Sequence, residues 1–369
     1  MSVLTVSFLV SMITSLWLIR YNYLHAHFSA DSDLGSVQKF HIRPVPRIGG
    51  LGIFLALLIS FGVRYFQNHE IGSFGLVLIF CSLPAFIFGF MEDITKRIGV
   101  KIRLLASMLS ALLSGYFLDA WLTSVQIFGI DNLMLAYPAL AIGITCFAVA
   151  GVANAFNIID GYNGLSSSVA LIIAVAIFYV AFQVSDLPLM IAALALMGAL
   201  AGFLVWNYPR GLIFMGDGGA YLIGFWIAEL SVLLTSRHPE VSKWFPMLLC
   251  MYPIFETLFT IYRRVVLKNV HPGMPDALHL HQLFYRRILS AEIRSEADRN
   301  SMTSPYLWLL CLLAAIPAVL FWRNHILLKM FCALFAITYI WIYWAIVRFK
   351  TPRFLTIIKK NSAISGSVE

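Results

Sequence analysis

The sequence predicts an all-α, polytopic membrane protein built as a helix bundle. Of its 369 residues, 60% are apolar and only 12% are charged, whereas soluble proteins carry about 25% charged residues. Apolar runs of roughly 18 to 24 residues recur along the chain, and each is long enough to cross a bilayer as a helix. The first run has no basic residue before it and no small-x-small site after it, so we expect a retained membrane helix rather than a secretory signal.

About eleven membrane crossings are predicted within a single integral membrane domain over residues 1–369. We expect them at 2–19, 48–66, 72–90, 104–121, 133–152, 166–184, 188–206, 218–236, 244–262, 305–322 and 325–347. The five cysteines all lie inside these apolar runs and form no CxxC pair, which argues against disulfide or zinc frameworks.

The connections between crossings fall into two sets on opposite sides of the membrane. One set comprises 20–47, 91–103, 153–165, 207–217, 263–304 and the C-terminal tail, and it holds most of the 26 lysines and arginines. The other set holds only Arg64, Arg237, Lys243, Arg323 and Lys329. Because basic residues accumulate on the cytoplasmic side, we expect the N-terminus outside and the C-terminus inside. Topology and membrane lipids explain the net charge of +8 without a nucleic-acid partner.

Every unusual polar cluster falls in the predicted cytoplasmic set. The third crossing ends in Glu92 and Asp93, followed by Lys96, Lys101 and Arg103. One interpretation is an i,i+4 ion pair with basic anchors at the membrane edge. The other is a carboxylate pair for a divalent cation with basic groups for phosphate oxygens.

The stretch "NAFNIIDGYNGL" places Asn154, Asn157 and Asp160 at intervals of three residues. On a helix end these side chains would share one face. A helix cap followed by a turn is the structural alternative, since Asp-Gly and Asn-Gly are turn formers. A cap needs one such residue, however, so a row of them favours a binding face.

In "FMGDGG", Asp217 lies between glycines just before an apolar run, with Phe214 three residues earlier. A capped glycine-rich turn would explain this. An acid here also suits Mg²⁺, which binds one or two carboxylates plus substrate phosphate oxygens, and the Phe214 ring suits stacking on a base.

The longest inner loop contains His279 and His281, followed by Arg286 and Arg287. No third zinc-type ligand is nearby, so a pyrophosphate suits these side chains better than zinc. A basic amphipathic segment at the lipid headgroups is the alternative. Two further acids, Glu229 and Glu256, fall inside predicted crossings, where acids are functional candidates by default, but neither joins a motif.

Taken together, the motifs resemble those of the polyprenyl-phosphate N-acetylhexosamine-1-phosphate transferases. The ordered series is "RPVPRIGG" (43–50), "EDITK" (92–96), "NAFNIIDGYNGL" (154–165), "FMGDGG" (214–219) and "HLHQL" (279–283). Each motif alone is weak, but the ordered set on one membrane face is specific.

The resemblance implies transfer of sugar 1-phosphate from a UDP-N-acetylhexosamine to undecaprenyl phosphate, with release of UMP. It implies Mg²⁺ or Mn²⁺ as cofactor, the bacterial inner membrane as location, and a cleft facing the cytoplasm. Members of the family can dimerise, so a homodimer is one expected state.

Residue roles follow by motif. The resemblance implies that Asp217 is a metal ligand and that Phe214 stacks on uracil. Asp93 would orient or deprotonate the lipid phosphate near the metal, with Glu92 beside it, while Lys96 and its basic neighbours Lys101 and Arg103 would meet phosphate.

On the nucleotide side, Asn154, Asn157 and Asp160 would hold the nucleotide and shape the metal site. His279 and His281 would meet the pyrophosphate or the sugar. We expect an in-line attack by the lipid phosphate, with a covalent phosphoryl-Asp93 intermediate as the alternative.

The histidine pattern favours the branch that starts O-antigen and common-antigen glycans. The peptidoglycan enzyme, phospho-N-acetylmuramoyl-pentapeptide transferase, usually shows an "HHH" pattern and about one crossing fewer, and it stays as an alternative. Three positions depart from the family pattern, because Glu92 replaces an acid that is commonly Asp, Asn163 replaces an acid, and Gln282 replaces a histidine. An ion-coupled transporter is the alternative of another class, but it predicts internal repeats and polar residues near the midplane.

Overall fold

The computed structural model describes residues 2–24, 45–267, 278–290, 293 and 295–348. Within these ranges the elements are all helices, which confirms the predicted all-α class. Most of the connection 20–47, part of 263–304 and nearly all of the C-terminal tail lie outside the described residues.

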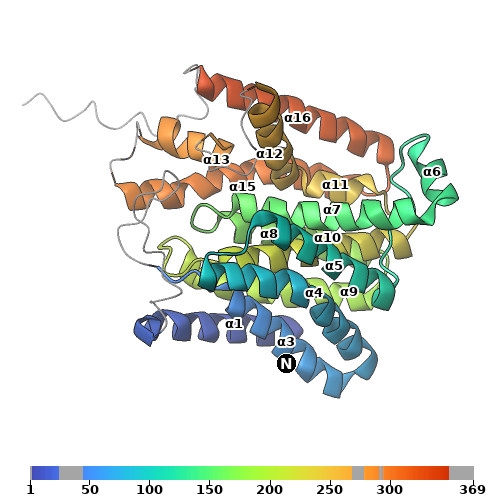
Figure 1. Ribbon diagram of the computed structural model, residues 1–369, viewed down its shortest axis with the longest axis horizontal. Helices are drawn as coiled ribbons and strands as arrows, with labels where there is room; N and C mark the ends of the chain where they lie inside the picture. The colour runs from blue at the N-terminus through green and yellow to red at the C-terminus, as the bar shows by residue number, and fades with distance from the viewer. Residues whose placement is uncertain (1, 25–44, 268–277, 291–292, 294, 349–369) are drawn as a thin grey trace, which may run out of the picture.

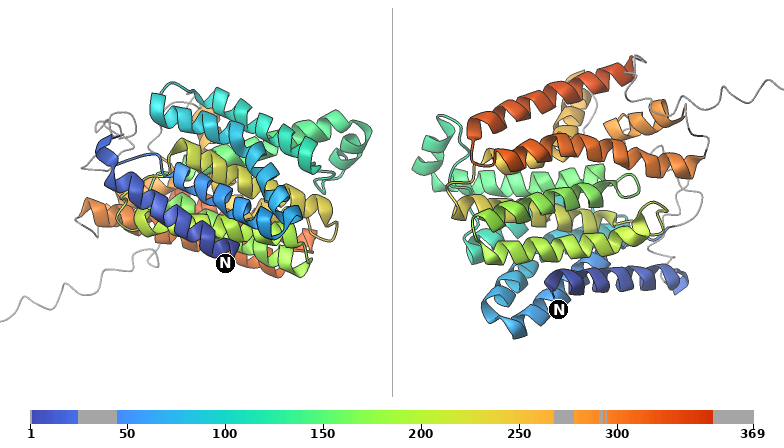
Figure 2. Two further views of the ribbon diagram at one scale, coloured as in Figure 1. Left: turned by 90° about the horizontal axis from the view of Figure 1, so that it is seen from below. Right: turned by 180° about the vertical axis from the view of Figure 1, so that it is seen from behind.

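Ten helices are long and apolar enough to span a membrane, counted over the described residues. They are α1 (Val3–Arg20), α3 (Gly50–Gln67), α4 (His69–Thr95), α5 (Val100–Leu118), α7 (Pro138–Ile159), α8 (Leu165–Gln183), α9 (Leu187–Asn207), α10 (Gly216–Arg237), α15 (Glu296–Leu320) and α16 (His325–Val347). Most of them run side by side along the long axis of the molecule (Figures 1 and 2). The protein is therefore a multi-pass helical membrane protein.

The crossing predicted at 244–262 is not one continuous helix. It consists of α11 (Trp244–Leu249) and α12 (Met251–Tyr262), which is followed by the π-helical turn η1 (Arg263–Leu267). Pro253 lies in the first turn of α12, where its missing N–H is tolerated, whereas inside a continuous helix the same proline would disrupt the backbone bonds. The remaining short elements are α6 (Ile130–Ala136), α13 (Leu280–Leu283) and the π-helical η2 (Phe284–Leu289).

Three helices extend beyond their predicted apolar spans at the end that carries the polar motifs. Helix α4 continues to Thr95, α7 continues to Ile159, and α15 begins at Glu296, where the Ser295 side chain accepts from the backbone N–H of Asp298. Hydropathy marks only the apolar part of a helix, but backbone hydrogen bonding continues past it. As a result, the acidic and amide motifs stand on rigid helix ends.

Helix α10 is the centre of the bundle, and every residue from Gly216 to Thr235 is buried. Its first turn is pressed against two neighbouring helices through glycines. A Cβ on Gly50 of α3 would collide with Gly219, and a Cβ on Gly89 of α4 would lie 2.8 Å from the backbone of Gly218. Small residues allow such close helix approach in membranes, and they fix the start of α10 beside the end of α4.

The predicted connections meet at the two ends of the bundle as expected. At one end, the backbone N–H of Phe214 donates to the carbonyl oxygen of Pro46 at 2.8 Å. At the other, the Ser242 hydroxyl and the Lys329 ammonium donate to side-chain and backbone oxygens of Gln126 at 2.8 and 2.7 Å. The two sets therefore lie at opposite ends, and the assignment of the first end to the cytoplasm stays a prediction.

Candidate active site

Asp93, at the end of α4, is tied to the start of α10. Its carboxylate is buried and accepts the backbone N–H groups of Asp217 and Gly218, each at 2.8 Å. This arrangement is an N-terminal cap supplied by another helix, favoured by the positive end of the helix dipole. Its neighbour Glu92 accepts the backbone N–H of Ile98 at 2.6 Å and so shapes the turn between α4 and α5.

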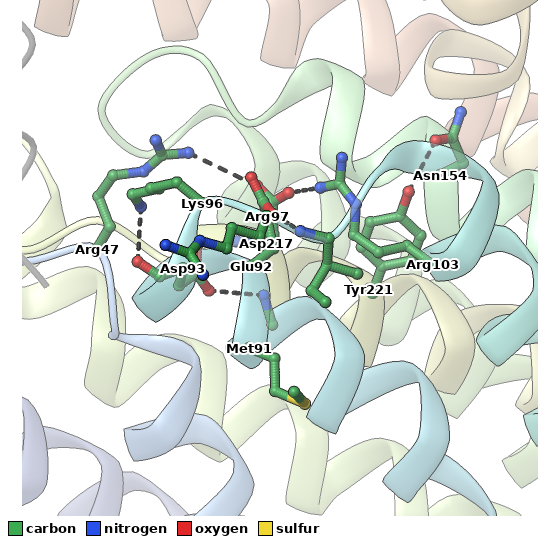
Figure 3. A network of polar contacts seen from close by, with 12 residues as sticks. Arg47, Met91, Glu92, Asp93, Lys96, Arg97, Arg103, Asn154, Asp217 and Tyr221 are labelled. Carbon is green, nitrogen blue, oxygen red and sulfur yellow. Dashed lines mark hydrogen bonds and ion pairs between the residues drawn. The ribbon is translucent and has the colours of Figure 1, made fainter. Parts of the chain in front are cut away.

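Asp217 lies between two guanidinium groups (Figure 3). Its Oδ2 pairs with Nη1 of Arg103, and its Oδ1 lies 3.6 Å from Nη2 of Arg47. Gly216 precedes it with φ +76°, and a Cβ there would collide with the backbone oxygen of Arg47 and approach Asp93. Only glycine fits this left-handed and crowded position, which lets the three segments converge.

Arg103 continues the network toward α7. Its guanidinium lies 5.5 Å from the ring centroid of Tyr221, and the Tyr221 hydroxyl donates to Oδ1 of Asn154 at 2.9 Å (Figure 3). The structure thus joins the predicted phosphate residue Arg103 of α5 to the predicted nucleotide residue Asn154 of α7 through Tyr221 of α10.

Asp160 is the residue that ends α7, and its backbone N–H donates to the carbonyl oxygen of Asn157. Burial raises the pKa of Asp160 to about 7, while the positive charge of Arg47 lowers it. A cation near this carboxyl therefore favours its ionised form at neutral pH. The side chains of Asn154 and Asn157 are partly buried on the same helix, three residues apart as the sequence predicts.

His281 lies against the loop that follows Asp160, and His279 lies beside His281. The rings of His279 and His281 are nearly parallel, with centroids 5.1 Å apart, and His281 meets Tyr162 edge-on at 5.5 Å. A Cβ on Gly161 would lie 3.5 Å from Nε2 of His281. The histidine motif therefore packs directly on the "NAFNIIDGYNGL" segment.

The other predicted contact residues differ in how firmly they are held. Phe214 is partly buried, and its carbonyl oxygen accepts the N–H of Gly49 at 2.9 Å, so the "RPVPRIGG" segment fixes its backbone. Lys96 ends α4 with φ 56° and donates to the carbonyl oxygen of Asp93 at 2.6 Å. Lys101 is exposed on α5.

Asn163, the departure from the family pattern, has a structural role. Its side-chain NH₂ donates to the carbonyl oxygen of Pro209 at 2.9 Å, and its backbone N–H donates to Oδ1 of Asn300 at 2.9 Å. The hydroxyl of Ser304 donates to its carbonyl oxygen at 2.6 Å. These contacts join the loop after α7 to α15 and to the segment after α9.

Several residues of this region had no role predicted from the sequence. Arg47 reaches Asp217 although no role was expected for it, and the only signal was its position in "RPVPRIGG". Tyr221 lies in an apolar run of the sequence, and Asn300 lies in a polar stretch. Neither belongs to a motif, so the sequence provided no reason to select them.

The residues fit a metal ion that substrate would help to hold. Among the described residues, no three His, Cys, Asp or Glu side chains gather closely enough to bind a metal by themselves. Mg²⁺ usually binds one or two carboxylates and completes its shell with substrate phosphate and water, and the side chain of Asp217 is 12% exposed. Asp93 retains further acceptor capacity beyond its two backbone bonds. Metal binding by Asp217 and Asp93 stays a prediction.

The fold and site define a multi-pass membrane protein with an acidic and arginine-lined centre at one end of its bundle. The sequence profile of glycosyl transferase family 4 matches residues 75–235. The undecaprenyl-phosphate alpha-N-acetylglucosaminyl 1-phosphate transferase of Thermotoga maritima is 30% identical over 251 residues, which cover 68% of this chain and 72% of the relative. This chain belongs to the polyprenyl-phosphate N-acetylhexosamine-1-phosphate transferases of glycosyl transferase family 4.

Two other relatives show the breadth of the family. The probable undecaprenyl-phosphate N-acetylglucosaminyl 1-phosphate transferase of Bacillus subtilis is 27% identical over 290 residues, 75% of this chain and 76% of the relative. The phospho-N-acetylmuramoyl-pentapeptide-transferase of Streptococcus pneumoniae is 29% identical over 222 residues, 58% of this chain and 64% of the relative.

Proposed function

We propose that this protein transfers N-acetylhexosamine 1-phosphate from a UDP-sugar to undecaprenyl phosphate and releases UMP. The observation that carries the proposal is the position of Asp217, whose side chain lies between Arg47 and Arg103 and whose own backbone N–H donates to Asp93. This arrangement gathers carboxylates and guanidinium groups at one end of a membrane bundle. A soluble nucleotide sugar and a membrane-bound phosphate can both reach such a place.

Charge explains why the reaction needs these residues. The donor pyrophosphate and the acceptor phosphate are both anionic and repel each other. Arg47 and Arg103 would bind phosphate oxygens and stabilise charge on the transferring phosphoryl group. Mg²⁺ or Mn²⁺, held by Asp217 and Asp93 together with substrate oxygens, would supply further neutralisation of that charge.

The contacts of Asp93 favour direct attack by the lipid phosphate over a phosphoryl-enzyme. Both carboxylate oxygens of Asp93 already accept backbone N–H groups, which lowers their nucleophilicity. Incubating the protein with β-phosphate-labelled UDP-sugar and no lipid acceptor should leave the protein unlabelled. Label retained on Asp93 would establish the two-step route instead.

We further propose that the site faces the cytoplasm of the bacterial inner membrane and that the product starts a cell-envelope glycan of the O-antigen type. Peptidoglycan pentapeptide transfer is the second candidate, and the Streptococcus pneumoniae relative favours it. The crossing predicted at 244–262 is split into two short helices. The number of membrane-spanning helices therefore does not distinguish the O-antigen branch from the peptidoglycan branch. The histidine pattern around His279 and His281 carries the preference.

The test measures UMP release by purified protein in detergent, supplied with undecaprenyl phosphate and Mg²⁺. The donors to be compared are UDP-GlcNAc, UDP-GalNAc, their 6-deoxy forms and UDP-N-acetylmuramoyl-pentapeptide. We expect UMP release with an N-acetylhexosamine donor, its loss with EDTA and its recovery with added Mg²⁺. Turnover of the pentapeptide donor alone would assign the second candidate, and no UMP from any donor would reject the function.

A further inference from the structure

Glu256 is a buried acid of α12 whose carboxylate collects three donors. It is 1% exposed. Its Oε1 lies 3.0 Å from Nδ1 of His279, its Oε2 accepts the Tyr339 hydroxyl at 2.8 Å, and the backbone N–H of Leu280 lies 3.2 Å from Oε1. The donors come from the histidine motif and from α16, so one carboxylate joins three separate segments of the chain.

The arrangement determines which nitrogen of His279 carries a proton. A carboxylate only accepts hydrogen bonds, so an unprotonated Nδ1 would place two sets of lone pairs opposite each other at 3.0 Å. Nδ1 therefore carries hydrogen and donates to Glu256, with the hydroxyl of Thr260 also 3.3 Å away. Nε2 is then the ring nitrogen that Glu256 does not contact.

His279 is also placed where a ligand of the candidate site would lie. Its ring is nearly parallel to that of His281, which packs on Gly161 directly after Asp160. The side chain of His279 retains 11% exposure, while that of Glu256 retains 1%. The acid thus lies behind the imidazole, on the side away from the solvent-accessible face.

We propose that Glu256, assisted by Tyr339, is a positioning residue that holds His279 with Nε2 directed to the pyrophosphate of the nucleotide sugar. The inference rests on the proposed function, since it names how one ligand group of that site is oriented. A carboxylate behind an imidazole fixes the ring and its tautomer. Nε2 then meets a phosphate oxygen, to which it donates a hydrogen bond when it carries a proton.

A purely structural role for Glu256, as a link between α12, α13 and α16, makes a different prediction. Glu256→Gln keeps the size of the side chain but replaces one acceptor oxygen with an NH₂ donor, so it no longer accepts from all three partners. If Glu256 only joins helices, this change lowers the melting temperature, and its effect on kcat is independent of His279. If Glu256 acts through His279, the two substitutions are strongly non-additive.

A double-mutant cycle of Glu256→Gln and His279→Asn distinguishes these roles. We expect each single variant to lower kcat by about 10- to 100-fold, as loss of a partner behind a ligand histidine typically does. The double variant should be no slower than His279→Asn alone. Tyr339→Phe, which removes one of three donors, should cause a smaller loss. Independent, multiplicative losses in the double variant would overturn the proposal.

Glu229→Gln is the matched control. Glu229 is also a fully buried acid, and it lies on α10 about 18 Å along the helix from Asp217, given a rise of 1.5 Å per residue. We expect this variant to retain the kcat of the parent protein. A loss of kcat as large as that of Glu256→Gln would show that changing any buried acid disturbs the bundle. The double-mutant cycle would then no longer support a role for Glu256 through His279.

A second readout separates failure of this inference from failure of the proposed function. In full-length protein labelled with ¹⁵N-histidine, the signal of His279 is identified by its loss in His279→Asn. We expect a protonated Nδ1 in the parent protein and loss of this tautomer preference in Glu256→Gln. An unprotonated Nδ1 would overturn the inference even if UMP release is normal. Absence of UMP release with a protonated Nδ1 would reject the proposed function but not the placement of His279.

Discussion

Replacing Asp93 with Asn tests whether one carboxylate both caps α10 and serves the reaction. The carboxylate accepts two backbone N–H groups at 2.8 Å, and Asn would present an NH₂ donor to one of them. Loss of a helix cap costs about 0.5–2 kcal/mol, and a hydrogen bond to a charged group contributes about 1.5–3 kcal/mol. We expect a loss of about 2 kcal/mol, or a melting temperature lower by about 3 °C for a chain of this length.

Activity should fall further than this loss of stability explains. At a temperature well below the melting transition, most of the Asp93→Asn protein remains folded. We expect kcat for UMP release to fall by about 100-fold or more, the scale of a lost acid–base or orienting group. Glu70→Gln, in the exposed first turn of the same helix, is the control and should change neither quantity. An unaltered melting temperature would refute the capping role, and full kcat would refute the role in transfer.

Three further substitutions test the local arguments. Gly216→Ala should prevent correct folding, because φ is +76° and the new methyl would collide with backbone. Gly151→Ala is the control: Gly151 lies on a helix with nothing within 4 Å of the added Cβ, so this change should stabilise the protein by about 0.5–1 kcal/mol. Equal melting temperatures of the two variants would contradict the packing argument. Asn163→Asp should destabilise by about 1–3 kcal/mol without raising kcat, because its NH₂ donates to a backbone carbonyl; a gain in kcat would show a missing catalytic acid instead. Arg103→Lys should raise KM by about tenfold through loss of the planar contact with Asp217 and the ring beneath it, and an unaltered KM would exclude Arg103 from substrate binding.

Hydropathy was sufficient to predict the class and nearly every crossing, because each bilayer span must be long and apolar. It did not predict the break at Cys250, after which a new helix begins at Met251 with Pro253 in its first turn. It also ended α4 and α7 too early, since the polar turns that carry Asp93 and Asn157 continue the helices beyond the apolar span.

The candidate site was predicted by residue type but not by contact. The sequence indicated that Asp93 and Asp217 act in one place, and the structure joins them through a backbone cap. Their relation depends on glycine contacts between α3, α4 and α10, which no local pattern reveals. Arg47 and Glu256 had no assigned role because their partners lie far away in the sequence.

The fate of the β-phosphate tests the central claim most directly. With UDP-GlcNAc labelled at the β-phosphorus, undecaprenyl phosphate and Mg²⁺, transfer of sugar 1-phosphate places the label in the lipid product and releases unlabelled UMP in equal amount. Label that stays in soluble nucleotide, with UDP as the product or with no product formed, would contradict the account.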